Sequence, residues 1–200
     1  MNFRIKQAIE DLKNGKPIVV VDSIDREWEG DIVLSAETVT KENLIFTINH
    51  AKGLMCLPTT GEILDRLEIP LMVEKTSDPL ETPFTVSIDG IDTGTGMSVE
   101  DRLKTIKILL NENSKPTDLK KPGHLFPLRA KKGLLKERQG HTEASIELMK
   151  LANLKLVAII CEIMNEFGEM RKGNELEQFA KIYNLTFISV EEIYKTVYGE

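Results

Sequence analysis

The ten residues from Asp22 to Asp31 hold five carboxylates and one arginine, and they directly follow the apolar run Ile18 to Val21. A run of β-branched residues is typical of a buried strand, so these acids are expected at the end of a strand. In α/β proteins, reactive groups gather there. Carboxylates this close repel one another and stay charged at low cost only in water or around a cation. The pattern indicates either a solvated charged turn or a site for a hard divalent metal.

A second group of reactive side chains lies in the segment Arg138 to Glu143. Thr142 is expected to cap the helix that follows, which would leave backbone N–H groups and the positive helix end free. Arg138 adds a forked donor, and Gly140 permits close approach to the backbone. The segment is a candidate phosphate site that includes His141. The alternative is an ordinary helix cap with a surface histidine.

Three other titratable side chains deserve comparison. His124 has a proline on each side, in a stiff loop that suits a positioned acid or base, although a structural role is the alternative. Glu162 follows an expected buried strand, where desolvation would favour proton transfer near neutral pH; its alternative is a structural ion pair. His50, near a helix end, is expected to be structural.

Composition bounds the class of protein. The chain has 200 residues, 41% of them apolar, which is enough for one domain over residues 1–200 with a sizeable core. A net charge of -6 gives no basic field for nucleic acid or an anionic membrane. Cys56 and Cys161 lie in apolar runs without CxxC spacing, so we expect reduced thiols in a cytoplasmic protein. No apolar run suggests a signal peptide or a membrane span.

Hydrophobic periodicity predicts alternating helices and strands, hence a layered α/β protein whose strand order stays open. In the helix after His141, Ala144, Leu148 and Leu151 are expected to face inward and Glu143, Glu147 and Lys150 outward. The segments 111–123 and 125–130 read as turn-rich and irregular. The expected helices are Phe3–Leu12, Glu42–Lys52, a short one near Leu64 to Met72, Ser98–Leu110, Glu143–Leu151, Glu175–Tyr183 and Glu191–Tyr198. Ser98 and Asp101 are expected to be capping partners at the start of the fourth of these helices. The expected strands are Ile18–Val21, Ile32–Ala36, Leu54–Leu57, Phe84–Ile88, Leu156–Cys161 and Phe187–Val190.

Six motifs occur in one order along the chain, and together they resemble the 3,4-dihydroxy-2-butanone-4-phosphate synthase family. The resemblance runs from about Ile9 to Gly168, and the ordered set is far more specific than any single motif. The motifs are Asp25-Arg26-Glu27-Trp28-Glu29-Gly30-Asp31, Phe84-Thr85-Val86-Ser87, Thr95-Gly96-Met97-Ser98 with Asp101-Arg102, Pro122-Gly123-His124-Leu125-Phe126-Pro127-Leu128, Gly140-His141-Thr142-Glu143-Ala144, and Ile160-Cys161-Glu162-Ile163-Met164-Asn165.

This family cleaves D-ribulose 5-phosphate into L-3,4-dihydroxybutan-2-one 4-phosphate and formate, in riboflavin biosynthesis. The resemblance therefore implies a carbon–carbon lyase that uses Mg²⁺ or Mn²⁺, with two divalent ions per site when substrate is bound. It implies a homodimer with active sites at the subunit interface. With the alternation of elements, it implies an α/β (α+β) fold, a single three-layer domain with a mixed central β-sheet flanked by helices.

The resemblance also implies roles for individual residues. Glu27 and His141 resemble the metal ligands, and His124 and Glu162 resemble the residues essential to catalysis. Asp22 is expected to join them as an acid or base. Cys56 matches a position that lines the site, and Thr95 one that reaches the phosphate in the partner's site. The expected substrate contacts are Arg26, Glu27, Asp31, Thr95, Arg138, Gln139, Gly140, His141, Thr142 and Glu162.

These residue types suit the expected reaction. Neighbouring hydroxyl and carbonyl oxygens of a ketose can chelate a hard cation, which acidifies the adjacent C–H and stabilises an enediolate. His124 and Glu162, with Asp22, are expected to exchange the protons, and the sequence leaves open which acts first. Arg138 and the helix amino terminus are expected to hold the phosphate. A mobile acidic turn is a hypothesis, and the sequence leaves open whether the turn closes over substrate.

The chain departs from the family pattern in a few places. Leu125 stands where valine is commoner, Gln139 stands where alanine is common, and residues 74–83 match poorly. The chain ends soon after Tyr198 without the cyclohydrolase domain of fused relatives, so the synthase activity alone is expected. Two rival functions stay open: a non-catalytic metal- or phosphate-binding regulator, and an aldolase or isomerase acting on another sugar phosphate.

Overall fold

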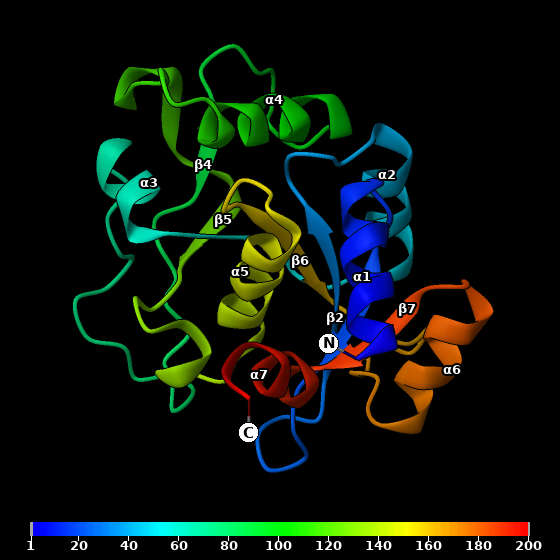
Figure 1. Cartoon of the computed structure of the whole chain (residues 1–200). Coiled ribbons are helices and arrows are strands. Elements are labelled where there is room, and N and C mark those ends of the chain that lie inside the picture. Colours follow the sequence, from blue (N-terminus) through cyan, green and yellow to red (C-terminus); the bar gives the residue numbers. More distant parts are fainter. Residues whose placement is uncertain (1, 200) are drawn as a thin grey trace.

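The computed structural model describes residues 2–199, which form one seven-stranded sheet covered by helices (Figure 1). The strands are β1 (Ile18–Val21), β2 (Gly30–Ser35), β3 (Cys56–Thr59), β4 (Ile88–Gly90), β5 (Leu119–Arg129), β6 (Ala158–Glu162) and β7 (Thr186–Ser189). The helices are α1 (Phe3–Lys13), α2 (Lys41–His50), α3 (Gly61–Arg66), α4 (Val99–Leu110), α5 (His141–Ala152), α6 (Asn174–Ile182) and α7 (Val190–Tyr198), with short 3-10 turns at Pro116–Asp118 and Leu134–Lys136. None of these helices is long and apolar enough to cross a membrane.

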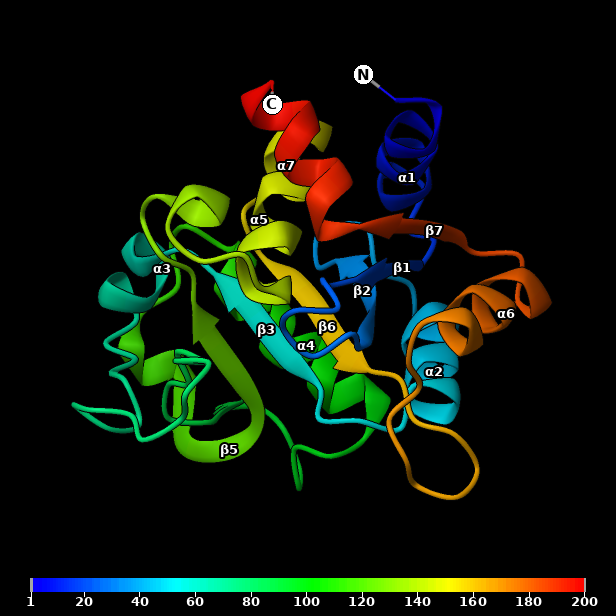
Figure 2. The same ribbon diagram turned by 90° about the horizontal axis from the view of Figure 1, so that it is seen from below.

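The sheet is mixed, and its strand order is β4-β5-β3-β6-β2-β1-β7. The pairs β1–β7 and β3–β5 are parallel, and the other neighbours are antiparallel. Figure 2 shows α1, α5 and α7 on one side of the sheet and α2, α4 and α6 on the other. The expected three layers around a mixed sheet are therefore confirmed.

The central strands are mostly apolar because helices cover both of their faces, and their charged residues, Asp31 and Glu162, lie at strand ends. In β1, Val20 packs in the core formed with α1, α5 and α7, whereas Val19 and Val21 pack on the opposite face beside α6. The acidic turn connects β1 to β2, whose residues Val21 and Gly30 pair in register. Both ends of the turn are thus fixed by buried strands. The valine run predicted the first of these strands, β1.

The expectation for residues 119–129 is wrong, because they form β5, whereas residues 111–118 are turn-rich as predicted. This strand contains Pro122 and Pro127, which lack the N–H of a regular ladder, and its exposed lysines hide any alternation of apolar residues. His124 therefore lies on a strand and not in a loop. The expected strand Phe84–Ile88 is also displaced: β4 begins at Ile88, and residues 84 and 85 form only isolated bridges.

Helix α5 differs from expectation at its start and on its outer face. It begins at His141, and Gly140 is the N-cap, so Thr142 lies inside the first turn and caps nothing. Glu143 and Glu147 are buried rather than outward, because Glu143 accepts a hydrogen bond from Arg138 and Glu147 accepts one from Tyr198. A carboxylate can be buried when a partner satisfies it in this way.

At α4, Ser98 caps the helix as predicted, by accepting from the backbone N–H of Asp101. The Asp101 carboxylate does not complete a capping box. It instead accepts from the backbone N–H groups of Gly94 and Gly96 and so holds the turn that carries Thr95.

Candidate active site

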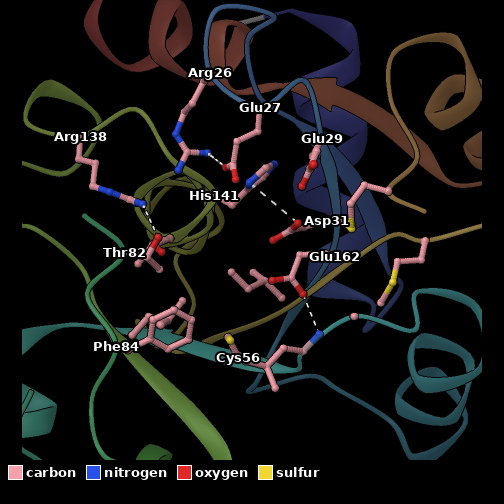
Figure 3. A pocket seen from close by; sticks show the side chains of 17 residues that line it. Arg26, Glu27, Glu29, Asp31, Cys56, Thr82, Phe84, Arg138, His141 and Glu162 are labelled. Carbon is pink, nitrogen blue, oxygen red and sulfur yellow. Dashed lines mark hydrogen bonds and ion pairs between the residues drawn. The ribbon is translucent and has the colours of Figure 1, made fainter. Parts of the chain in front are cut away.

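A pocket of about 370 Å³ opens where β2 begins, β6 ends and α5 begins (Figure 3). Its size suits a small phosphorylated sugar. It collects polar groups from segments that are far apart in the sequence. The lining residues are Arg26, Glu27, Glu29, Asp31, Gly53, Leu54, Cys56, Thr82, Phe84, Leu128, Arg138, His141, Thr142, Ile160, Glu162, Met164 and Met170.

The acidic turn is organised around Arg26. One of its terminal nitrogens, Nη1, lies 2.6 Å from Asp22 Oδ2 and 2.5 Å from Glu27 Oε2. The second Asp22 oxygen accepts from the backbone N–H of Glu29 at 3.0 Å. The guanidinium offsets part of the repulsion between the carboxylates. Asp25, in contrast, is exposed to solvent.

His141 presents a free nitrogen to the pocket. Its Nε2 lies 3.2 Å from the carbonyl oxygen of Val20, and because a carbonyl only accepts, Nε2 carries the ring proton. In the neutral ring Nδ1 is then unprotonated, and it lies 3.9 Å from Asp31 Oδ1. Burial lowers the pKa of His141 and so favours the neutral ring. A neutral imidazole fixed through its other nitrogen is a typical metal ligand.

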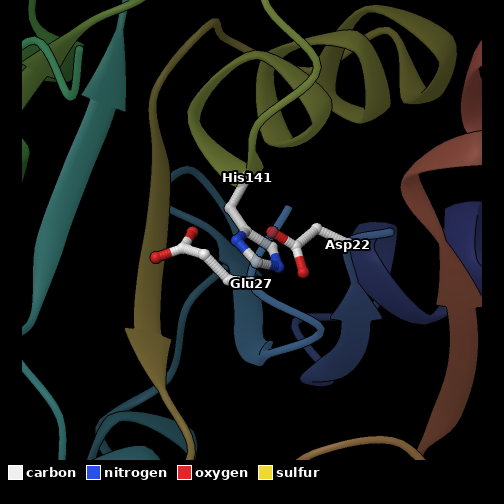
Figure 4. Close-up of side chains that lie close together, drawn as sticks. All are labelled: Asp22, Glu27 and His141. Atoms are coloured by element: carbon white, nitrogen blue, oxygen red, sulfur yellow. The ribbon is translucent and has the colours of Figure 1, made fainter. Parts of the chain in front are cut away.

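Asp22, Glu27 and His141 each offer a ligand atom, and these atoms lie within 4.8 Å of one another (Figure 4). Beside them, Asp31 is buried, and among residues 2–199 its Oδ1 has no hydrogen-bond partner. Burial raises the pKa of Asp31 well above its usual range, and the nearby Glu162, Asp22 and Glu27 raise it further. An oxygen-rich cluster with one imidazole and an unsatisfied carboxylate fits a hard divalent cation.

Glu162 is held by the backbone of residues 53 and 54. Its Oε2 accepts from the N–H of Leu54 at 2.8 Å, and its carbonyl accepts from the N–H of Gly53 at 3.1 Å. A Cβ at position 53 would lie 2.5 Å from Oε2, so only glycine allows this approach. Sequence reasoning missed the role of Gly53 in placing Glu162.

Helix α5 directs its amino terminus at the pocket, and no side chain caps it. Free N–H groups of a first turn favour an anion. Arg138 lies beside them: Nη1 bonds Glu143 at 2.7 Å, Nε bonds the carbonyl of Leu80 at 3.0 Å, and Nη2 bonds Thr82 Oγ1 at 3.3 Å. Gly140 leaves room for this guanidinium, since a Cβ there would lie 2.3 Å from Nη1.

Three expected site residues lie away from this pocket, and two more, Asp22 and Gly140, adjoin the lining residues Arg26 and His141 without lining the pocket themselves. His124 does not line the pocket, and its Nδ1 lies 2.7 Å from Oδ2 of the buried Asp89. Thr95 is next to Gly96, where a Cβ would lie 2.1 Å from the same Asp89 oxygen. His124, Asp89 and the Thr95 turn therefore form a second cluster at the β4–β5 edge of the sheet. Gln139 is exposed and does not line the pocket either.

Several lining residues were missed by sequence reasoning. Thr82 and Phe84 come from or adjoin the poorly matching segment 74–83, and Met164 and Met170 flank the turn 165–169, which contains no histidine. Glu29, to which the sequence analysis assigned no role, also lines the pocket. Cys56, expected to line the site, does so, and burial raises the pKa of its thiol. His50 is remote and packs between the rings of Phe46 and Tyr183.

The fold and this pocket define an α/β protein with donor groups for a divalent cation and a phosphate. A family model described as 3,4-dihydroxy-2-butanone 4-phosphate synthase matches residues 6–196. The chain belongs to this family.

Relatives and solved structures agree with this assignment. The chain is 44% identical to the 3,4-dihydroxy-2-butanone 4-phosphate synthase of Photorhabdus laumondii subsp. laumondii, over 95% of this chain and 88% of the relative. It is 42% identical to the 3,4-dihydroxy-2-butanone 4-phosphate synthase of Agrobacterium fabrum, over 98% of this chain and 93% of the relative. A solved 3,4-dihydroxy-2-butanone 4-phosphate synthase in complex with two magnesium ions superposes with a TM-score of 0.90 at 37% identity, over 96% of this chain and 95% of that one.

Proposed function

We propose that this protein converts D-ribulose 5-phosphate into L-3,4-dihydroxybutan-2-one 4-phosphate and formate, as a lyase of riboflavin biosynthesis. The observation that carries the proposal is the convergence in one pocket of Glu27, His141, Glu162 and the uncapped start of α5, with Asp22 beside Glu27 and His141. Family membership supports the same reaction. Free, buried thiols at Cys56 and Cys161 support a cytoplasmic location.

Glu27 and His141, with Asp22 beside them, would hold the cation, and Mg²⁺ or Mn²⁺ suits their oxygen and imidazole donors. A relative solved with two magnesium ions supports binding of two divalent ions. When bound, the cation supplies Lewis-acid polarisation of substrate oxygen atoms. The first turn of α5 and Arg138 would bind the phosphate.

Glu162 is the proposed proton carrier inside the pocket. The N–H of Leu54 fixes Oε2, which leaves Oε1 to take a proton from substrate carbon or return one to oxygen. Asp22 has both oxygens engaged, by Arg26 and by the N–H of Glu29, so we now favour a positioning role for it. Arg26 and Asp31 line the same pocket and are proposed substrate contacts.

His124 is proposed to act in the pocket of a second copy of the chain. Asp89 accepts from Nδ1 of His124, which leaves Nε2 on the open side to exchange protons. His124 and Thr95 lie together at the β4–β5 edge of the sheet, away from the pocket of the same chain. Each chain therefore carries two separate parts of the proposed site. A homodimer that joins the pocket of one protomer to this edge of its partner would complete both sites.

The reaction is tested by incubating the purified protein with ribulose 5-phosphate and Mg²⁺, with and without chelator, and measuring formate. The proposal predicts formate that depends on the metal. No formate in the presence of Mg²⁺ would reject it and favour a non-catalytic binding protein. Isomerised pentose without carbon loss would favour an isomerase.

A further inference from the structure

The segment that follows β6 lies against the acidic turn, and the geometry points to Lys172 as a positioning residue for the Glu27 carboxylate. Here the acidic turn is residues 22–31, and the hairpin is residues 163–173. Lys172 is 145 positions away from Glu27 in the sequence, yet its ammonium reaches the Glu27 backbone. The inference rests on the ion-binding role proposed for Glu27.

The acidic turn has backbone hydrogen bonds of its own, from Asp22 to Glu29 and from Arg26 and Trp28 to Ser23, but its charges are not balanced. Arg26 is its only cation, and this side chain is already bonded to Asp22 and Glu27. Trp28, between Glu27 and Glu29, has a φ of 56°, in the left-handed region that a bulky side chain disfavours. Contacts from outside the turn must therefore offset both the charge repulsion and this backbone conformation.

The hairpin is a well-bonded platform for those contacts. It leaves β6 directly after Glu162 and is closed by an antiparallel bridge between Met164 and Met170. The backbone N–H of Asn165 bonds the carbonyl of Glu169 at 2.8 Å. Met164 and Met170 also line the pocket, so the hairpin and the acidic turn border the same cavity.

Lys172 joins the two segments. It pairs with Glu29 in an isolated antiparallel bridge, and its Nζ donates to the carbonyl of Glu27 at 3.0 Å and lies 3.2 Å from Glu29 Oε1. Next to it, Gly173 leaves space for the indole of Trp28, because a Cβ there would lie 2.3 Å from the ring. One ammonium therefore fixes the main chain that carries Glu27 and offsets the charge of Glu29.

The test exploits Trp28, which is the only tryptophan of the sequence and therefore the sole source of indole fluorescence. In the full-length protein we expect Lys172→Met to increase acrylamide quenching of Trp28. We also expect it to weaken Mg²⁺ binding, measured by calorimetry, by about tenfold, the usual effect of losing a partner outside the metal's own ligands. Lys172→Arg should restore both readouts. Lys195→Met removes an equal charge from a surface pair with Glu191 and should change neither.

Wild-type Mg²⁺ affinity or wild-type quenching in Lys172→Met would overturn the inference. Lys172 is about half exposed, with 48% of its side chain accessible, so circular dichroism should show an intact fold. If it does not, Gly173→Ala decides, because it keeps Lys172 but places a Cβ against Trp28 and should shift both readouts in the same direction. Neither readout uses substrate, so a wild-type protein that released no formate would reject the proposed function without altering this result.

Discussion

Asp31 and Glu162 lie directly opposite each other on the antiparallel strands β2 and β6, and both line the same pocket. Figure 3 shows the two carboxylates side by side, below the imidazole of His141. Like charges in directly opposed positions destabilise a sheet. The fold thus retains an unfavourable pair at the point where a divalent cation would turn repulsion into attraction.

Asp31→Asn is expected to stabilise the metal-free protein at pH 7. The folded-state pKa of Asp31 is raised, chiefly by burial, above its ordinary value of 3.8. Stability is therefore greatest when Asp31 is protonated, and it falls as the pH rises through 3.8 towards the folded-state pKa. Asparagine does not ionise, so the variant avoids this loss of stability. At pH 7 the melting temperature of Asp31→Asn should exceed that of wild type by at least about 2 °C, the shift expected for ~1 kcal/mol in a domain of this size.

The pH dependence supplies the check on Asp31→Asn. The difference between the variant and wild type should disappear below pH 3.8, where both carry a neutral side chain. Asp25→Asn, in the exposed part of the same turn, is the matched control and should leave the melting temperature unchanged. A metal-free Asp31→Asn protein that melts below wild type at pH 7 would contradict the assigned cost of ionising Asp31.

Glu162→Gln is expected to lower formate release by about 10²-fold or more, the usual contribution of a positioned acid or base. Glutamine keeps an oxygen that can accept from the N–H of Leu54, so circular dichroism and melting should stay close to wild type. Glu166→Gln is the control, because this carboxylate is exposed in the turn that follows. Substantial turnover in Glu162→Gln would remove Glu162 from its proposed role.

Gly53→Ala is expected to damage the site through the backbone. The new Cβ would lie 2.5 Å from Glu162 Oε2 and 2.6 Å from its carbonyl, so Glu162 must move. We expect at least a ~10-fold loss of formate release and a loss of about 1–3 kcal/mol in the free energy of unfolding. Gly133→Ala, whose nearest neighbours are atoms of the flexible Glu137 side chain, should retain activity. Wild-type kinetics in Gly53→Ala would contradict the contact.

A shared site predicts complementation between inactive subunits. His124→Ala and Glu162→Gln each remove one part of the site, and a mixed dimer would contain one pocket with both parts intact. After unfolding and refolding equal amounts together, formate release should recover to roughly a quarter of wild type, by random pairing of protomers in a twofold dimer. Recovery no greater than the mean of the two variants alone would place His124 and the pocket in the same chain.

Local signals predicted most of the fold. The valine run gave β1, helical periodicity with the Ser98 cap gave α4, and their bounds agree with the structure within a residue or so. Strand β5 could not be found in this way, because Pro122, Pro127 and exposed lysines remove the alternation that marks a strand. Pairing with β3 and β4 imposes its extended conformation, and pairing is a tertiary effect.

The sequence predicted which residues belong to the site, but few of the contacts that orient their side chains. Family resemblance selected Glu27 and His141, and the structure brings both to one cluster with Asp22. The partners that orient the reactive groups were not foreseen. Leu54 and Glu162 are 108 positions apart, and His124 and Asp89 are 35 apart, so no local pattern links them. Such contacts arise from strand order, which the sequence left open.

The most direct test of the proposed cleavage of ribulose 5-phosphate follows one carbon atom. The family resemblance implies that the carbon released as formate is C4. With substrate labelled with carbon-13 at C4, in the presence of Mg²⁺, the label should appear by NMR in formate, and the phosphate should remain on an unlabelled four-carbon ketone. Chelator should abolish this transfer. A label that stays in unchanged or isomerised pentose phosphate would contradict the account.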